Sequence, residues 1–230
     1  MQFLENSLIG LRAACHQLRG PPGLPDICLF PMIHIGAAEY YAEVSRRLAT
    51  CDVVLFEGVG SVQSWWITRS YALATHRKRL GLVLQRDAID RGLLQSRGIH
   101  ADVTAAQFRA SWGEIPLRYR VALLILSPLY GVWVYLTGTR ESIGRHMSVE
   151  EVESKSELFE RVPELRDAIV TTRDARLVEK LAAAVESSGA GQRIGVIYGA
   201  GHMRVASRLL TGQYKYRVAE SEWITVFGYE

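Results

Sequence analysis

Little in this sequence points to a secreted, disulfide-bonded or repetitive protein. It holds three cysteines in 230 residues, at Cys15, Cys28 and Cys51, too far apart for the C-x-x-C spacing of a zinc or redox motif. An odd number of scattered cysteines favours buried, reduced thiols. The N-terminus lacks the basic segment and following apolar run of a signal peptide. We therefore expect a cytoplasmic protein.

The sequence also lacks a strong excess of charge of either sign. Its 27 Lys and Arg residues against 24 Asp and Glu leave a net charge of +3. The densest basic run, His76–Arg79, is predicted to lie on the solvated face of a helix over Ser61–Arg79. Nucleic-acid-binding domains usually carry a localised basic stripe together with aromatic stacking residues. We therefore expect no nucleic-acid partner, and the sequence does not indicate an oligomeric state.

Short apolar runs alternate with helical patterns along most of the chain. Ile27–Ile33, Val53–Phe56 and Arg193–Tyr198 are typical of buried strands. Ala37–Leu48 has apolar residues near a helical period, so it makes a strand, helix, strand unit with the first two runs. Such units pair their strands in parallel. The pattern predicts an α/β fold with a central, mostly parallel sheet and flanking helices.

The whole chain, 1–230, is long enough for one α/β domain with a sizeable core. Leu4–Leu18 reads as an amphipathic helix, and Pro163–Glu186 as a second, longer one. A helical insertion, apolar and then charged, is expected at about 113–160. The final apolar runs at 214–218 and 223–227 predict an antiparallel edge hairpin at the C-terminus.

One apolar segment complicates this interpretation. Val121–Thr139 carries no charge and lies between Arg120 and Arg140, and its 19 residues are about the length that spans a bilayer. Pro128 and Gly131 interrupt it, and a single span would separate two halves of the chain that we expect to share one site. We favour a buried helical hairpin, an apolar lid or a segment resting on a membrane over a true span. Peripheral membrane contact through 121–139 would make the protein membrane-associated.

Three polar residues stand where a predicted buried strand gives way to a loop or helix: His34, Glu57 and His202. In open α/β sheets, ligands bind outside the carboxyl ends of the strands. Two imidazoles and a carboxylate are the residue types of a metal site, or of a water-activating base with an orienting partner. Singly, each residue has an ordinary structural explanation. Their shared placement favours a functional site.

Four short motifs occur in an order that resembles the TraB/PrgY, GumN and Tiki group, whose distant relatives are the ChaN-like and erythromycin-esterase-like proteins. The motifs are Met32–Gly36, Asp52–Glu57, Arg173–Asp174 and Gly199–His202. The resemblance spans about 27–210, with the middle third unmatched apart from a loose segment over Gln85–Asp102. The group has two G-x-x-H motifs, and the first of them has Pro31 here in place of glycine. On pattern alone, Arg173 fits a surface charge patch with Asp174, Arg176 and Glu179.

The resemblance implies that His34, Glu57, Arg173 and His202 converge in a metal-dependent, peptidase-like hydrolase. His34, His202 and Glu57 would bind a divalent ion such as Mn, Co or Zn, and Glu57 would act as ligand or base. Arg173 would stabilise the oxyanion of a peptide or small-molecule substrate. Two alternatives stay open. One is an esterase-like hydrolase without metal, with His34 as general base oriented by Glu57. The other is a non-catalytic protein that binds a peptide or small ligand.

Overall fold

The computed structural model describes residues 1–62, 72–147 and 157–229. The helix predicted over Ser61–Arg79 therefore lies largely outside the described residues. Its final part is a short helical stretch at 72–75, followed by a 3-10 turn, η1 (Lys78–Leu80). The charged half of the expected insertion is likewise described only up to residue 147 and again from residue 157.

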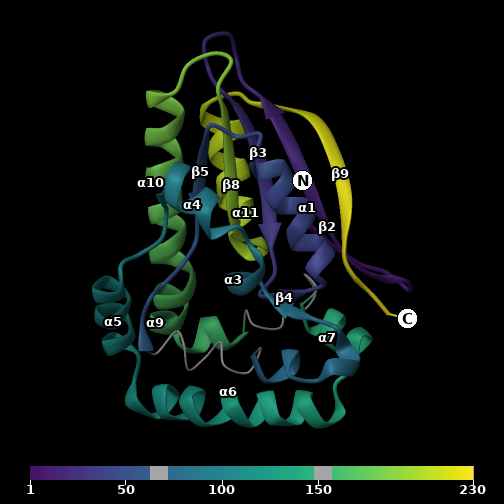
Figure 1. Cartoon of the computed structure of the whole chain (residues 1–230). Coiled ribbons are helices and arrows are strands. Elements are labelled where there is room, and N and C mark those ends of the chain that lie inside the picture. The colour runs from purple at the N-terminus through teal and green to yellow at the C-terminus, as the bar shows by residue number, and fades with distance from the viewer. Residues whose placement is uncertain (63–71, 148–156, 230) are drawn as a thin grey trace.

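Within the described residues, seven strands form one mixed sheet in the order β1-β2-β3-β8-β5-β7, with β9 paired to the other side of β2 (Figure 1). The strands are β1 (Leu4–Asn6), β2 (Gly10–Arg19), β3 (Asp26–Met32), β5 (Val53–Phe56), β7 (Gly98–His100), β8 (Arg193–Gly199) and β9 (Arg217–Gly228). The pairs β3–β8, β8–β5 and β5–β7 are parallel. The predicted α/β fold with a mostly parallel core is confirmed.

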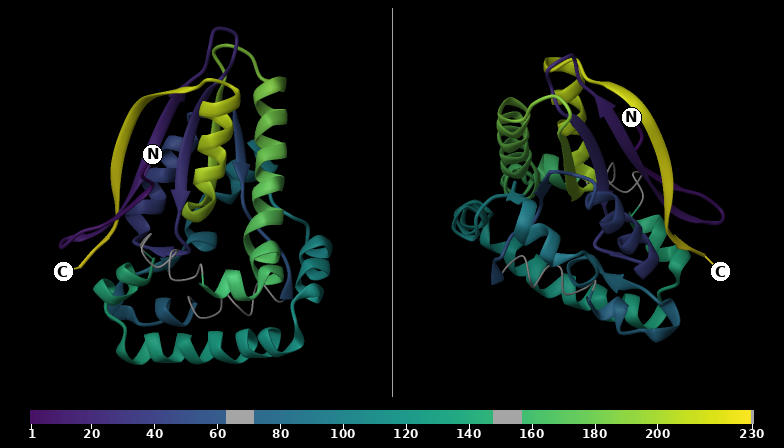
Figure 2. Two further views of the ribbon diagram at one scale, coloured as in Figure 1. Left: turned by 180° about the vertical axis from the view of Figure 1, so that it is seen from behind. Right: turned by 45° about the horizontal axis from the view of Figure 1, so that its top comes forward.

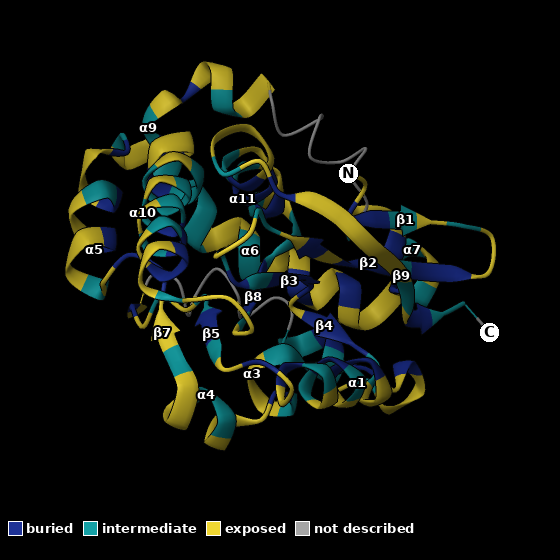
Figure 3. Cartoon of the chain, turned by 90° about the horizontal axis from the view of Figure 1, so that it is seen from above, coloured by how far each residue is buried: buried dark blue, intermediate teal, exposed yellow. Residues whose placement is uncertain are grey.

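The central strands are buried on both faces. Side chains of β3 alternate between two clusters: Phe30 packs with helix α1 (Ala38–Leu48), and Leu29 packs with α10 (Thr172–Ser187) and α11 (Met203–Arg208). Figures 2 and 3 show the helices on the two sides of the sheet, with buried residues along the strands between them. Burial on both faces explains why these strands read as continuous apolar runs.

The N-terminal segment is not the helix that its sequence pattern predicts. Residues 4–18 form β1 and most of β2, so the prediction for Leu4–Leu18 is wrong. β2 pairs with β9 along its whole length, and its other edge pairs with β1 and then β3. Tertiary pairing on both edges outweighs a local preference for helix, which is weak in any case.

The C-terminal antiparallel edge is present, but it is built differently from the expected hairpin. One 12-residue strand, β9, runs antiparallel to β2 from Arg19↔Arg217 to Gly10↔Gly228. The segment expected as the first strand of a hairpin contains Tyr216, whose hydroxyl donates to the carbonyl of Pro25 at 2.8 Å and whose ring is buried. The partner strand of β9 is therefore at the other end of the chain.

The remaining described helices lie mainly at one end of the sheet, toward which β3, β5 and β8 run (Figure 1). They are α3 (Gln85–Ala88), α4 (Arg91–Arg97), α5 (Ala105–Glu114), α6 (Leu117–Thr137), α7 (Arg140–Met147) and α9 (Pro163–Arg166). A two-stranded sheet of β4 (Ile35–Gly36) and β6 (Val83–Leu84) lies beside them. The predicted helix over Pro163–Glu186 is confirmed as α9, a π-helical turn (Asp167–Thr171) and α10.

Helix α6 corrects the expectation of a helical hairpin in the apolar segment. It runs without interruption for 21 residues, with Pro128 inside it and Gly131 buried. Proline removes one backbone hydrogen bond, but the helical bonds on either side persist. By length and composition α6 could cross a membrane. Of its most apolar 18 residues, only 11% are buried in the protein.

Candidate functional site

The three residues predicted at strand ends lie at one edge of the sheet. Glu57 follows β5 directly, His34 comes two residues after β3, and His202 ends a 3-10 turn (Ala200–His202) that follows β8. The parallel register places Met32 opposite Gly199 and Phe56 opposite Ile197, so the three strands end side by side. The carboxyl ends of β3, β5 and β8, which are far apart in the sequence, therefore lie at the same edge of the sheet.

Glu57 is the central side chain of this edge. Its Oε1 forms an ion pair with Nη2 of Arg173, and its Oε2 accepts the backbone N–H of Gly199. The two side chains are only 10% and 13% exposed. A Cβ on Gly199 would lie 3.1 Å from Oε2 of Glu57, so the absence of a side chain there permits the close approach. Helix α10 and strand β8 together hold the carboxylate in place.

Arg173 also binds a second carboxylate, that of Asp102. Its Nε donates to Oδ1 at 3.0 Å and its Nη2 donates to Oδ2 at 2.8 Å. The Asp102 side chain is fully buried and also accepts the backbone N–H groups of Gly58 and Val103, at 3.1 and 2.8 Å. Arg173 is therefore a bridge between two buried acids. The predicted surface patch is instead made by Arg176 and Glu179, which pair with each other at 2.6 Å.

Asp102 and Asp174 are the members of this arrangement that sequence reasoning missed. Nothing in the spacing of Asp102 distinguishes it, but it follows β7 by two residues, so it stands at the carboxyl end of another parallel strand. Asp174 reads as part of a charged helix face. Its Oδ1 is bonded to Nδ1 of His202 at 2.6 Å. The first turn of α10 thus supplies Arg173 to Glu57 and Asp174 to His202.

The pKa values of the two acids are set by opposing effects. Burial raises the pKa of Glu57, but the positive charge of Arg173, with smaller effects of His34 and His202, outweighs it, and the pKa lies below the ordinary 4.5. Burial likewise raises the pKa of Asp102, and its bonds to Arg173 bring the pKa below 3.8. Burial lowers the pKa of Arg173 while Glu57 and Asp102 raise it, with a net increase. All three groups are charged near neutral pH.

A cavity of about 410 Å³ opens at this edge. His34, Glu57 and Arg173 line it together with apolar side chains that include Phe56 and Ile89. The His34 side chain is exposed, and its backbone carbonyl accepts the N–H of Gln85 at 3.0 Å, which ties its loop to the start of α3. A volume in this range suits a small molecule or one residue of a peptide. The cavity brings together three of the four predicted residues.

His202 is placed differently from the other three and does not line this cavity. Its ring packs edge-on against Tyr198, with centroids 5.1 Å apart, and its Cδ2 would lie 3.5 Å from a Cβ on Gly199. That same position is 3.1 Å from Oε2 of Glu57. His202 therefore lies close to Glu57 near the end of β8, outside the cavity. It contributes to the lowered pKa of Glu57.

The predicted metal ligands do not form a ligand set as they are arranged here. Both oxygens of Glu57 already bind donors, and the guanidinium of Arg173 occupies the place beside the carboxylate that a cation would take. Among the described residues, no group of three His, Cys, Asp or Glu side chains is arranged to hold a metal ion. The hydrogen bond between Nδ1 of His202 and the carboxylate of Asp174 is of the kind that orients metal-binding imidazoles, but such a bond also orients a base.

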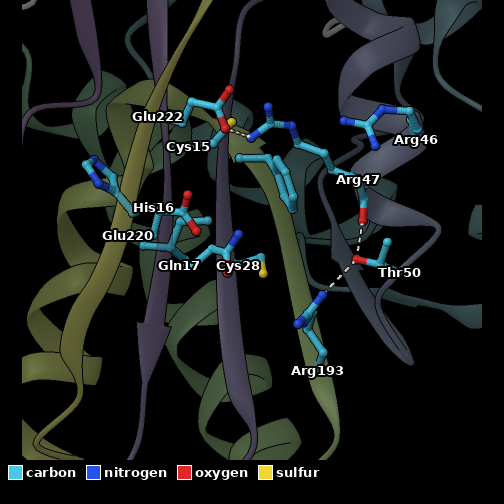
Figure 4. A pocket seen from close by; sticks show the side chains of 12 residues that line it. Cys15, His16, Gln17, Cys28, Arg46, Arg47, Thr50, Arg193, Glu220 and Glu222 are labelled. Atoms are coloured by element: carbon cyan, nitrogen blue, oxygen red, sulfur yellow. Dashed lines mark hydrogen bonds and ion pairs between the residues drawn. The ribbon is translucent and has the colours of Figure 1, made fainter.

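A second hollow, of about 270 Å³, lies elsewhere, between β2, β3 and the end of α1 (Figure 4). Arg47 on its wall is paired with Glu222 at 2.7 Å and with Glu43 at 2.6 Å. Arg193 donates to the hydroxyl of Thr50 at 3.1 Å. The hollow lies near the amino ends of β3 and β8, away from the edge where the predicted residues gather, and much of its charge is already paired. We therefore assign the functional site to the other cavity.

The cysteines near this second hollow allow a prediction of thiol reactivity. All three are free and buried. Burial raises the pKa of Cys15 to about 12, whereas a hydrogen bond with Cys51 lowers the pKa of Cys28. Because the thiolate is the reactive form, iodoacetamide should label Cys28 before Cys15 in the native protein, as followed by peptide mass spectrometry. Equal labelling rates for these two residues in the folded state would contradict this order.

Comparison with family models, with curated proteins and with solved structures found no match to this chain.

Proposed function

We propose that this protein is a hydrolase that acts on an ester or amide bond of a small molecule or peptide, with His34 as general base. The observation that carries the proposal is the cavity in which an exposed imidazole, a buried carboxylate and a buried guanidinium meet. Each comes from a different element, as expected for a site assembled by folding rather than by a local motif. The resemblance to the TraB/PrgY, GumN and Tiki group supports the same class of reaction.

The proposed reaction needs only groups of this chain and water. His34 takes a proton from a water molecule, which attacks the carbonyl carbon of the substrate and forms a C–O bond. The carbonyl electrons move to oxygen, and Arg173 stabilises the resulting oxyanion. The described bonds of Arg173 use Nε and Nη2, so Nη1 is the donor assigned to the substrate. When the bond to the leaving group breaks, protonated His34 returns the proton to it.

Glu57 and Asp102 serve as positioning residues in this mechanism. They hold the plane of the guanidinium by three charged hydrogen bonds, one to Glu57 and two to Asp102, so the N–H groups of Nη1 have a defined direction. Asp174 fixes the ring of His202 behind Glu57. A site held in this way needs little rearrangement when charge develops on the substrate.

The test compares His34→Ala with His76→Ala, using p-nitrophenyl esters of different acyl lengths and a set of fluorogenic peptides. His76 is exposed and its Nδ1 contacts the carbonyl of Ala72 at 2.7 Å, so its removal should leave hydrolysis unchanged. Loss of a general base should lower kcat by about 10²–10⁴-fold in His34→Ala. Equal activity of the two variants would contradict the proposal.

Assays with a strong chelator separate this mechanism from the metal-dependent one. The proposed mechanism predicts that hydrolysis survives chelation, and metal analysis of the purified protein accompanies the assay. Activity that is lost on chelation and restored by Mn, Co or Zn would assign the chemistry to His34, His202 and Glu57 as ligands instead. Saturable ligand binding without turnover, retained in Glu57→Gln, would make the cavity a binding site of a non-catalytic protein.

A further inference from the structure

We infer that α6 docks this protein in the plane of a lipid bilayer surface. The helix presents a broad apolar face to solvent: Leu117, Ile125, Leu126, Leu129, Trp133 and Leu136 are between 49% and 67% exposed. Its mean hydropathy reaches 1.5 over 18 residues, of which 11% are buried. An apolar helix in a protein core would be mostly covered, and this one is not. A continuous exposed apolar face of this size marks an interaction surface.

The ends of α6 decide how it meets the bilayer. Ile115, just before the helix, and Ile143, in α7 after it, are 1% and 5% exposed and belong to the clusters that pack the domain. Figures 1 and 2 show the helix lying across one end of the molecule, with α5 and α7 at its two ends. Because both ends are anchored in the same body, the helix lies flat along it. This geometry suits insertion to the depth of the headgroups and not a span.

Charges at both ends of α6 point to a lipid surface. Arg118 and Arg120 lie at its start, and the basic run Arg77–Arg79 lies near its end. Nη1 of Arg77 donates to the carbonyl of Gly138 at 2.8 Å, which brings the exposed side chains of Lys78 and Arg79 beside the C-terminal end of the helix. Basic residues that flank an apolar face are attracted to anionic headgroups. The basic run that reads from the sequence as a solvated face thus lies next to the apolar surface.

Aromatic residues on α6 agree with this partner. Tyr130 and Trp133 lie together, with ring centroids 5.8 Å apart, and both are exposed. Amphipathic rings of this kind favour the boundary between headgroups and acyl chains. A second copy of the chain is a poorer fit to the same face. Since both ends of α6 are basic, pairing two helices in either direction would bring like charges together.

The experiment is flotation of the full chain with vesicles of phosphatidylcholine alone and with phosphatidylglycerol added at one part in four. We expect association with the anionic vesicles and much weaker association with the neutral ones. Ile125→Glu/Leu129→Glu should reduce binding roughly tenfold or more, because two exposed apolar side chains that would enter the bilayer become charges. Lys78→Glu/Arg79→Glu should reduce binding to the anionic vesicles roughly tenfold and leave binding to the neutral ones unchanged.

A matched control carries the same substitutions on exposed apolar residues elsewhere. Leu8 and Ile9, in the turn between β1 and β2, are 98% and 72% exposed, and Leu8→Glu/Ile9→Glu should bind vesicles like the unchanged chain. Thermal unfolding of every variant shows whether it is folded. Failure of the chain to float, or equal flotation of the α6 variant and the control, would overturn the inference. Self-association that Ile125→Glu/Leu129→Glu abolishes, without any vesicle binding, would assign the face to a second copy and overturn it too.

Discussion

Replacing Arg173 with methionine is expected to lower the free energy of unfolding by about 3–5 kcal/mol, because it leaves two buried carboxylates without their cation. Glu57 and Asp102 are 10% and 0% exposed, and both bind the guanidinium. Methionine has a similar length and keeps the apolar contacts of the side chain. Urea denaturation of the two proteins, followed by circular dichroism at neutral pH, measures the difference.

The matched control is Arg176→Met on the same helix. Arg176 pairs with Glu179, which is 60% exposed, and such surface pairs contribute at most about 1 kcal/mol. A variant that combines Arg173→Met with Glu57→Gln and Asp102→Asn removes the uncompensated charges, so it should recover part of the lost stability. A stability loss below about 1 kcal/mol in Arg173→Met would contradict this prediction. It would show that the ion pairs of Arg173 with Glu57 and Asp102 do not stabilise this edge of the sheet.

The second large effect is a steep loss of stability in acid. The pKa values of Glu57 and Asp102 lie below 4.5 and 3.8, their ordinary values, in the folded chain. The unfolded chain therefore binds protons at these residues before the folded chain does. Their stabilisation is fully present above these ordinary values and is lost as pH falls through the folded pKa values. Two such groups give a slope of up to about 2.7 kcal/mol per pH unit in that interval.

Two variants separate this contribution from that of surface acids. The hydrogen bonds of Arg46 and Arg47 lower the pKa of Glu43 to about 2, so Glu43→Gln measures what a half-buried acid outside the site adds. Arg173→Met removes the main cause of the lowered pKa values at Glu57 and Asp102, and its stability should vary less between pH 5 and pH 2. Urea denaturation at a series of pH values tests both. An unchanged slope in Arg173→Met would show that other groups take up the protons.

Local pattern was sufficient for the elements whose environment is uniform along the chain. The strands β3, β5 and β8 are buried on both faces, so their apolar runs predict them directly. Helix α1 buries one face through Tyr41, Val44 and Leu48, so its 3.6-residue period is visible in the sequence. The same patterns place His34, Glu57 and His202 at strand ends. All of these signals depend on neighbours within a few residues.

Pairing between distant segments was beyond such patterns. Residues 4–18 alternate in a way that also fits a helix, and they are strands because Ala13 pairs with Ile224 at the opposite end of the chain. The same limit applies to the apolar segment. Pro128 and Gly131 suggest a break in the helix, but α6 is continuous and buries Gly131 and Val134 against the domain. In both cases the deciding contact is remote in sequence.

The positions of His34, Glu57 and His202 after three buried strands were thus determined by the sequence itself, because apolar runs and their ends are local properties. The partners of these residues were decided only by the tertiary structure. Arg173 reaches Glu57 and Asp102 across 116 and 71 residues of the sequence, and Asp174 reaches His202 across 28 residues. A charged residue on a helix has the same local signature whether it faces water or a buried carboxylate. Only the packing of α10 against the ends of the strands distinguishes the two.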